Sequence, residues 1–260
     1  MHKTLFRNPS LCVSVGLLGM LCFATSGFAS HPLISDDTGT MGTGNAQLEL
    51  NGEYDHDKED GVTTKTTEGS AHLTYGLNES IDLVGSFPYQ YAKTEEAGAN
   101  TTEDGIADIS FEVKWRFYER GDFSLALKPG FSLPTGDDDK GLGNGKSTHS
   151  LFFLASNETD LLAFHLNLGY TRNRNTGADE KDIWHASLAS SLALTERLVG
   201  VANIGIESNP DKLTDTDPAF LLAGLVYTLS DEFDLDCGVK YGLNDPETDY
   251  SILTGITWKF

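Results

Sequence analysis

Apolar and polar residues alternate with a period of two along most of this chain. The clearest stretch covers residues 108–118, where every odd-numbered position from Ile109 to Phe117 is apolar and every even-numbered position is polar. The following stretch, from Phe123 to Leu133, repeats the pattern after the short polar turn 119–122. Period two predicts strands with one apolar face and one polar face, and the short polar connection predicts a hairpin.

The same alternation predicts twelve strands. They lie near residues 45–55, 66–76, 80–91, 105–118, 122–133, 148–156, 160–171, 182–194, 197–208, 218–229, 233–243 and 249–260. Short connections at 77–79, 119–121, 157–159, 195–196 and 230–232 alternate with longer polar ones at 56–65, 92–104, 134–147, 172–181, 209–217 and 244–248. Strict alternation of short turns and long loops is typical of a transmembrane barrel. We therefore predict an all-β fold, a closed antiparallel up-and-down transmembrane β-barrel of about 12 strands over residues 45–260.

Aromatic residues on the predicted apolar face gather at both strand ends. At the turn ends they are Tyr75, Trp115, Phe117, Phe123, Tyr227, Phe233, Trp258 and Phe260. At the loop ends they are Tyr54, Tyr89, Tyr91, Phe131, Tyr170, Trp184, Phe220, Tyr241 and Tyr250. Two aromatic belts favour a membrane barrel over a soluble β-sandwich, which has no reason to band its aromatics. Phe260, the last residue, resembles the terminal signal through which outer-membrane barrels reach the barrel-assembly machinery.

The amino-terminal region has the pattern of a targeting segment. Lys3 and Arg7 precede an apolar run over residues 11–23. Gly27 and Ala29 then place small residues at the positions that a signal peptidase reads. This predicts a signal peptide over residues 1–29, with Ser30 or His31 as the first mature residue. A lipoprotein anchor at Cys22 is the disfavoured alternative, because no small residue precedes that cysteine. Residues 30–44 lack strand periodicity and are expected either to hang in the periplasm or to enter the barrel as a plug.

Net charge and hydropathy limit the classes of binding partner that this chain can have. The chain has 260 residues and a formal net charge of −21, a sign that argues against nucleic-acid binding. Beyond the amino terminus we find no apolar run of the roughly 20 residues that a spanning helix needs. The expected location is the outer membrane of a Gram-negative bacterium. Expected partners are lipid, lipopolysaccharide and a small-molecule solute.

Charged residues on the predicted inner face are the candidate site. The pore-lining residues we expect are Lys114, Arg116, Lys128, Glu112, Asp108, Asp234, Asp236 and Lys240. The three bases from Lys114 to Lys128 belong to the fourth and fifth strands, and the two aspartates belong to the eleventh, about half the circumference away. We hypothesise a basic strip facing an acidic strip across the lumen, with a transverse field that sets ion selectivity. The alternative is that Glu112 pairs locally with the bases and the network fills the barrel.

Other chemistry is weakly supported. The acidic loop 136–140 lacks the ligand order of a calcium loop, so a solvated loop is favoured, and no metal or cofactor is expected. An outer-membrane phospholipase-like enzyme is one rival function, and His149 with Ser150 is the only place where a His at an apolar-face position adjoins a Ser. Alternation turns these two side chains to opposite faces, so no catalytic residue is assigned. A structural or adhesive barrel without transport is the other rival.

Two motif blocks resemble a known family. The first joins His31-Pro32-Leu33, residues 36–40 and residues 44–50, and the second covers residues 128–136 followed by 140–143. Together they resemble the outer-membrane barrel family named for the meta pathway of phenol degradation. The resemblance covers essentially the whole mature chain. It implies a barrel channel for small solutes, with aromatic or hydrophobic compounds among the candidates, and it implies no catalytic residues.

Overall fold

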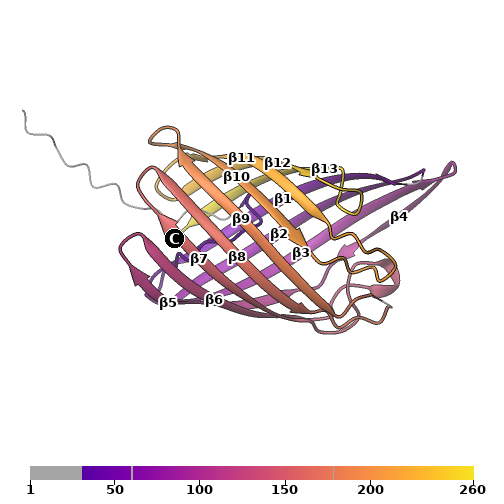
Figure 1. Cartoon of the computed structure of the whole chain (residues 1–260), viewed down its shortest axis with the longest axis horizontal. Coiled ribbons are helices and arrows are strands. Elements are labelled where there is room, and N and C mark those ends of the chain that lie inside the picture. Colours follow the sequence, from indigo (N-terminus) through magenta and orange to yellow (C-terminus); the bar gives the residue numbers. More distant parts are fainter. Residues whose placement is uncertain (1–30, 60, 178) are drawn as a thin grey trace, which may run out of the picture.

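The described part of the chain forms one closed sheet. The computed structural model describes residues 31–59, 61–177 and 179–260, so the predicted signal peptide (1–29) lies outside the described residues. Within these ranges the chain forms thirteen strands and one short 3-10 helix (Figure 1). The elements are β1 (Ala46–Glu59), β2 (Val62–Asn78), β3 (Ile81–Glu96), β4 (Ala99–Ile106), β5 (Ser110–Arg120), β6 (Phe123–Ser132), η1 (Asp138–Lys140), β7 (His149–Glu158), β8 (Leu162–Arg172), β9 (Asp182–Ala193), β10 (Leu198–Glu207), β11 (Ala219–Thr228), β12 (Phe233–Gly242) and β13 (Tyr250–Lys259). No helix among the described ranges is long and apolar enough to cross a lipid bilayer.

The sheet closes through its first and last strands. β1 pairs antiparallel with β13 from Gln47 opposite Lys259 to His56 opposite Tyr250. β4 and β5 share one position in the ring, because the outer part of β3 pairs with β4 and the remainder pairs with β5. The ring therefore has twelve positions, which confirms the predicted up-and-down barrel. The predicted single strand over 105–118 is corrected, since residues 107–109 interrupt it.

Two segments predicted as long loops are mostly strand. Residues 56–65 and 92–104 continue as paired strand into tight turns near Gly61 and at Ala97–Gly98, whose backbones have positive φ. β2 is 17 residues long and β3 is 16, whereas a tilted strand needs about 9–11 residues to cross a membrane. The strands around β4 accordingly project beyond the rest of the wall at one end of the barrel (Figure 1). The other four long connections have the predicted positions.

The outer wall carries the apolar face that the alternation predicts. Leu166, Leu188 and Ile204 lie next to one another on β8, β9 and β10, and all three are exposed. Most of the predicted belt aromatics are exposed or half-buried on this wall. Phe220 is a correction, because it is only 5% exposed and packs inside the barrel with Leu222.

We predict that the outer wall faces lipid. Leu188→Arg, near the middle of β9, should lower the free energy of unfolding by about 2–4 kcal/mol in a bilayer, while Leu194→Arg, at the turn end of that strand, should cost about 0–1 kcal/mol. Denaturant unfolding of both variants in lipid vesicles measures the difference. Equal costs at the two depths would contradict a membrane-facing wall.

Candidate functional site

Residues 31–44, called the luminal segment from here on, contact side chains that point inward from one strand after another. The backbone N–H groups of Ile34 and Ser35 both donate to the Asn203 side chain on β10, at 2.9 Å. The N–H of Asp36 donates to the Asn167 side chain on β8, at 2.8 Å. Because these wall residues supply acceptors that the irregular backbone needs, the segment is held without forming a strand of its own.

The rest of the luminal segment continues along the inner wall. The N–H of Thr38 donates to Ser156 on β7 at 3.1 Å, and the N–H of Met41 donates to the Asp82 carboxylate on β3. The contacted strands thus run in descending order, from β12 at His31 to β3 at Met41. The luminal segment follows the wall around the barrel interior before the chain enters β1.

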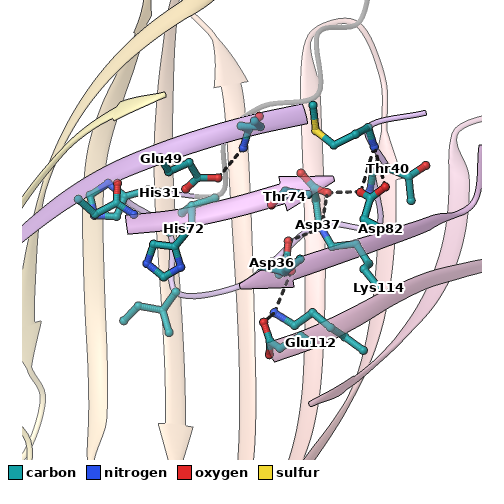
Figure 2. A pocket seen from close by; sticks show the side chains of 18 residues that line it. His31, Asp36, Asp37, Thr40, Glu49, His72, Thr74, Asp82, Glu112 and Lys114 are labelled. Atoms are coloured by element: carbon teal, nitrogen blue, oxygen red, sulfur yellow. Dashed lines mark hydrogen bonds and ion pairs between the residues drawn. The ribbon is translucent and has the colours of Figure 1, made fainter. Parts of the chain in front are cut away.

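Two of the predicted site residues, Lys114 and Lys128, contact the luminal segment, and Glu112 joins the cluster through Lys128 (Figure 2). Lys114 Nζ lies 2.7 Å from Asp36 Oδ1 and 3.5 Å from the Asp37 carboxylate. Lys128 Nζ lies 3.0 Å from Asp36 Oδ2 and 3.2 Å from Glu112 Oε2. Asp36 therefore bridges β5 and β6 with its two oxygens.

The Asp36 carboxyl is held strongly in its charged form. Burial alone would raise its pKa, but the charges of Lys114 and Lys128 and their hydrogen bonds outweigh burial. The net result is a pKa well below the usual range for aspartate. At neutral pH the luminal segment is consequently tied to the wall by an ionised carboxylate.

The remaining predicted site residues have partners outside this cluster. The Arg116 guanidinium donates to the Glu79 carbonyl at 2.9 Å. Asp108 lies between β4 and β5, where its carboxylate accepts the N–H groups of Gly136 and Asn144 and so anchors the 133–148 connection. The other three predicted residues form pairs on the opposite side of the barrel. These are Asp234 with Lys259 at 2.7 Å, Asp236 with His31 at 2.5 Å, and Lys240 with Glu247 at 3.2 Å.

The predicted basic and acidic strips are therefore each paired on their own side of the lumen. Local pairing of Lys128 with Glu112, which the sequence left open as the alternative, is present. The sequence did not reveal that Asp36 and Asp37 would be the main partners of Lys114. A transverse field across the lumen stays a prediction.

An apolar part of the lumen was missed by the sequence analysis. Leu33 of the luminal segment packs against two buried clusters on the inner wall. Their members are Val199, Val201 and Val226 in one and Phe220, Leu222 and Leu253 in the other. A signal was available, because β11 is apolar on both faces and so does not alternate as a strand with a wet inner face would.

Next to Leu33, Pro32 lies where two wall glycines make room for it. A Cβ added to Gly224 would lie 2.7 Å from Pro32 Cγ, and one added to Gly238 would lie 3.0 Å from Pro32 Cβ. Any larger residue at either position would push against the ring. Small residues on β11 and β12 thus allow the luminal segment to approach the wall closely.

A cavity of about 270 Å³ remains between the luminal segment and the wall formed by β1, β2, β3, β5 and β6 (Figure 2). Leu33, Ile34, Met41 and Val84 give it apolar surface. Its charged lining consists of five carboxylates, Asp36, Asp37, Glu49, Asp82 and Glu112, and of two lysines, Lys114 and Lys128. The cavity is therefore amphipathic, with an excess of acid.

No metal site is built among residues 31–59, 61–177 and 179–260, and the candidate pair His149 and Ser150 is not brought together. No group of three His, Cys, Asp or Glu side chains in these ranges is placed to hold a metal ion. His149 is exposed on the outer wall, whereas Ser150 lies inside beside Gly130 and Glu112. The two side chains point to opposite faces, as alternation predicts.

Comparison with known proteins fixes the family. A family profile described as "Putative MetA-pathway of phenol degradation" matches residues 35–260. The chain belongs to this family. The match confirms the resemblance drawn from the two motif blocks. A search of curated protein sequences finds no match.

Solved structures show the same barrel. The COG4313 outer membrane channel from Pseudomonas putida F1 has a TM-score of 0.69 at 12% identity, covering 86% of this chain and 98% of that one. The NanC porin has a TM-score of 0.56 at 10% identity, covering 82% and 100%. The KdgM porin, solved in complex with disordered oligogalacturonate, has a TM-score of 0.56 at 8% identity, covering 82% and 99%. At these identities the likeness establishes a shared outer-membrane barrel fold.

The ion pairs of Asp36 with Lys114 and Lys128 are called the Asp36 clamp. The low pKa of Asp36 predicts how this clamp responds to acid. A carboxyl whose pKa is lower in the folded than in the unfolded state stabilises the fold fully above the unfolded pKa of about 3.9. That stabilisation is lost only as the pH falls below this value. Wild type should exceed Asp36→Asn in unfolding free energy by about 3 kcal/mol, the lower end for a broken buried ion pair. Denaturant unfolding should show a constant difference from pH 8 to pH 5. A difference that shrinks between pH 7 and pH 5 would contradict the assignment.

Proposed function

We propose that this protein is a narrow outer-membrane channel of a Gram-negative bacterium that passes small solutes by diffusion. The observation that supports this most directly is the cavity beside the luminal segment, which is enclosed by the barrel wall and lined by both apolar and charged groups. At about 270 Å³ it is slightly smaller than the roughly 300–1,000 Å³ typical of sites for drug-sized ligands. The solutes are therefore small.

The solute class that fits this lumen is an aromatic or other hydrophobic compound with a polar group. Apolar side chains of β10, β11 and β13 form a patch that Leu33 covers. Lys114 on β5 pairs with Asp36 and Asp37, which follow Leu33 in the luminal segment. A molecule with an apolar body and one polar group can satisfy both surfaces at once, whereas a sugar leaves the patch uncovered.

The luminal segment acts as a plug in this proposal. It is held by wall side chains on β7, β8 and β10 and by the Asp36 clamp. Its contacts are hydrogen bonds, one ion cluster and a few apolar groups, which can be broken and remade without unfolding the barrel. The resting pore is partly occluded, and movement of the luminal segment widens it.

The two ends of the barrel support contacts with the barrel-assembly machinery and with lipopolysaccharide. Phe260 exchanges two backbone hydrogen bonds with Ala46, at 2.7 and 2.8 Å, and its side chain stays exposed. An exposed terminal aromatic at the closing seam supports recognition by the barrel-assembly machinery. Acidic outer loops support contact with lipopolysaccharide through divalent ions.

Single-channel conductance tests the plug. Gly238→Leu places a side chain where Pro32 lies and should raise conductance severalfold in planar bilayers. Gly69→Leu is the matched control, because no atom lies within 4 Å of an added Cβ there. Liposome swelling with graded small sugars should rise in parallel. Lipid hydrolysis would instead support a phospholipase-like enzyme, and neither activity would support a structural barrel.

Ion selectivity tests the acidic lining. The excess of carboxylates predicts that wild type prefers cations, and that the double variant Asp36→Asn with Asp37→Asn lowers the cation-to-anion permeability ratio severalfold because Lys114 and Lys128 lose counter-charge. Asp215→Asn, in an exposed loop, is the control for a change of one charge outside the lumen. Reversal potentials in a salt gradient measure the ratio. An unchanged ratio in the double variant would show that the permeation path avoids this cavity.

A further inference from the structure

Three polar atoms converge beside Gly255 on the inner wall. A Cβ added to Gly255 would lie 2.4 Å from Asp236 Oδ2, 2.7 Å from Asn51 Oδ1 and 2.8 Å from His31 Nδ1. The Asp236 side chain is only 1% exposed. Because residue 255 has no side chain, these atoms share a small polar space between β1, β12 and β13.

Two of these atoms are buried acceptors without a hydrogen-bond partner in the described part of the chain. They are Asp236 Oδ2 and Asn51 Oδ1. The other Asp236 oxygen is 2.5 Å from His31 Nδ1. A buried carboxylate oxygen without a donor destabilises the fold, so this space calls for a donor, preferably a cationic one.

Nearby cationic side chains are engaged elsewhere. Lys259 lies 2.7 Å from Asp234, and Lys240 lies 3.2 Å from Glu247 and 3.8 Å from Glu53. A further buried acid, Glu49, faces the same part of the lumen, where its Oε1 accepts a hydrogen bond from Gln47. The acidic groups around His31 therefore outnumber the cations that can reach them.

Removal of the predicted signal peptide would give the chain a new cation next to His31 in sequence. Hydrolysis of the predicted signal-peptide bond after Ala29 consumes one water, leaves a carboxylate on the released peptide and creates an α-ammonium on Ser30, or on His31 if one further residue is removed. One residue spans at most about 3.3–3.6 Å, so the position of His31 limits how far away that ammonium can lie. His31 is held by Asp236, and Pro32 is held between Gly224 and Gly238.

We propose that the mature amino terminus is bound in this luminal pocket, where its ammonium donates to Asp236 Oδ2 and Asn51 Oδ1. An ammonium has three donors and a positive charge, which match two acceptors, one of them a carboxylate oxygen. In the uncleaved precursor the same nitrogen is a neutral amide with a single N–H. Processing by signal peptidase therefore adds an anchor at the start of the luminal segment, beside the wall contacts that already hold residues 34–41.

Amine reactivity tests this proposal on the intact mature protein refolded in lipid. An α-amine has an ordinary pKa of about 7.7–8.0 and is acetylated faster than lysine near pH 7. We expect acetylation of the amino terminus, followed by mass spectrometry of its peptide, to be at least about tenfold slower in the folded barrel than in urea. Asp236→Asn and Asn51→Ala should each restore fast labelling.

Asn51→Ala is the more specific variant, because Asn51 Oδ1 has no hydrogen-bond partner in the described part of the chain, whereas Asp236 also holds the His31 imidazole. Asp234→Asn is the matched control, since it makes the same change two residues away on β12 in a carboxylate paired with Lys259. It should leave the amino terminus protected.

Two outcomes would overturn the proposal. One is an amino terminus that is labelled equally fast in folded and unfolded protein. The other is protection that survives both Asp236→Asn and Asn51→Ala. If labelling is fast and added sodium, potassium or calcium ions raise the melting temperature of wild type but not of Asp236→Asn, an inorganic cation fills the pocket in place of the amine. None of these readouts depends on whether the barrel transports solutes.

Discussion

Pairing of β1 with β13 is the constraint on which the rest of this structure depends. In a bilayer every backbone N–H and C=O needs a partner within the protein, and only a closed ring gives each strand two neighbours. Closure at twelve positions also fixes the width of the interior, which is between that of filled eight-stranded barrels and that of open sixteen-stranded porins. One irregular chain segment fits inside with space beside it. The polar inner faces of the strands then supply the acceptors that this segment needs, as Asn203 and Asn167 do.

The luminal segment and the charged wall stabilise one another. Lys114 and Lys128 point into a confined space where an unpaired ammonium would be costly, and Asp36 supplies the carboxylate that both contact. The net charge of −21 therefore says little about the lumen, because Asp36 and Asp37, two of the five carboxylates around the cavity, belong to a segment that precedes the barrel strands in sequence. Removing the luminal segment would change the charge of the pore as well as its width.

Local alternation made the barrel predictable, and its absence explains what was missed. Residues 108–118 alternate because one face meets lipid, so β5 could be read directly from the sequence. The outer part of β2, from Val62 to Glu68, carries Thr, Lys and Glu on both faces because it lies beyond the lipid and needs no apolar face. It therefore resembled a loop. The partners of Asp36 could not be predicted, since Lys114 lies 78 residues away and the segment has no periodicity to place it.

In the proposed channel, the apolar patch under Leu33 would link the stability of the occluded state to the chemistry of the solute. Moving Leu33 away exposes Leu222 and its neighbours to water, at a cost of about 25 cal/mol for each Å² of apolar surface. An apolar solute that covers the same patch recovers part of that cost, whereas a sugar recovers none. A solute shifts a conformational equilibrium only by binding one state better than the other. For the channel proposed above, the wall would therefore favour opening by hydrophobic solutes, and its specificity would depend on what replaces Leu33 on the patch.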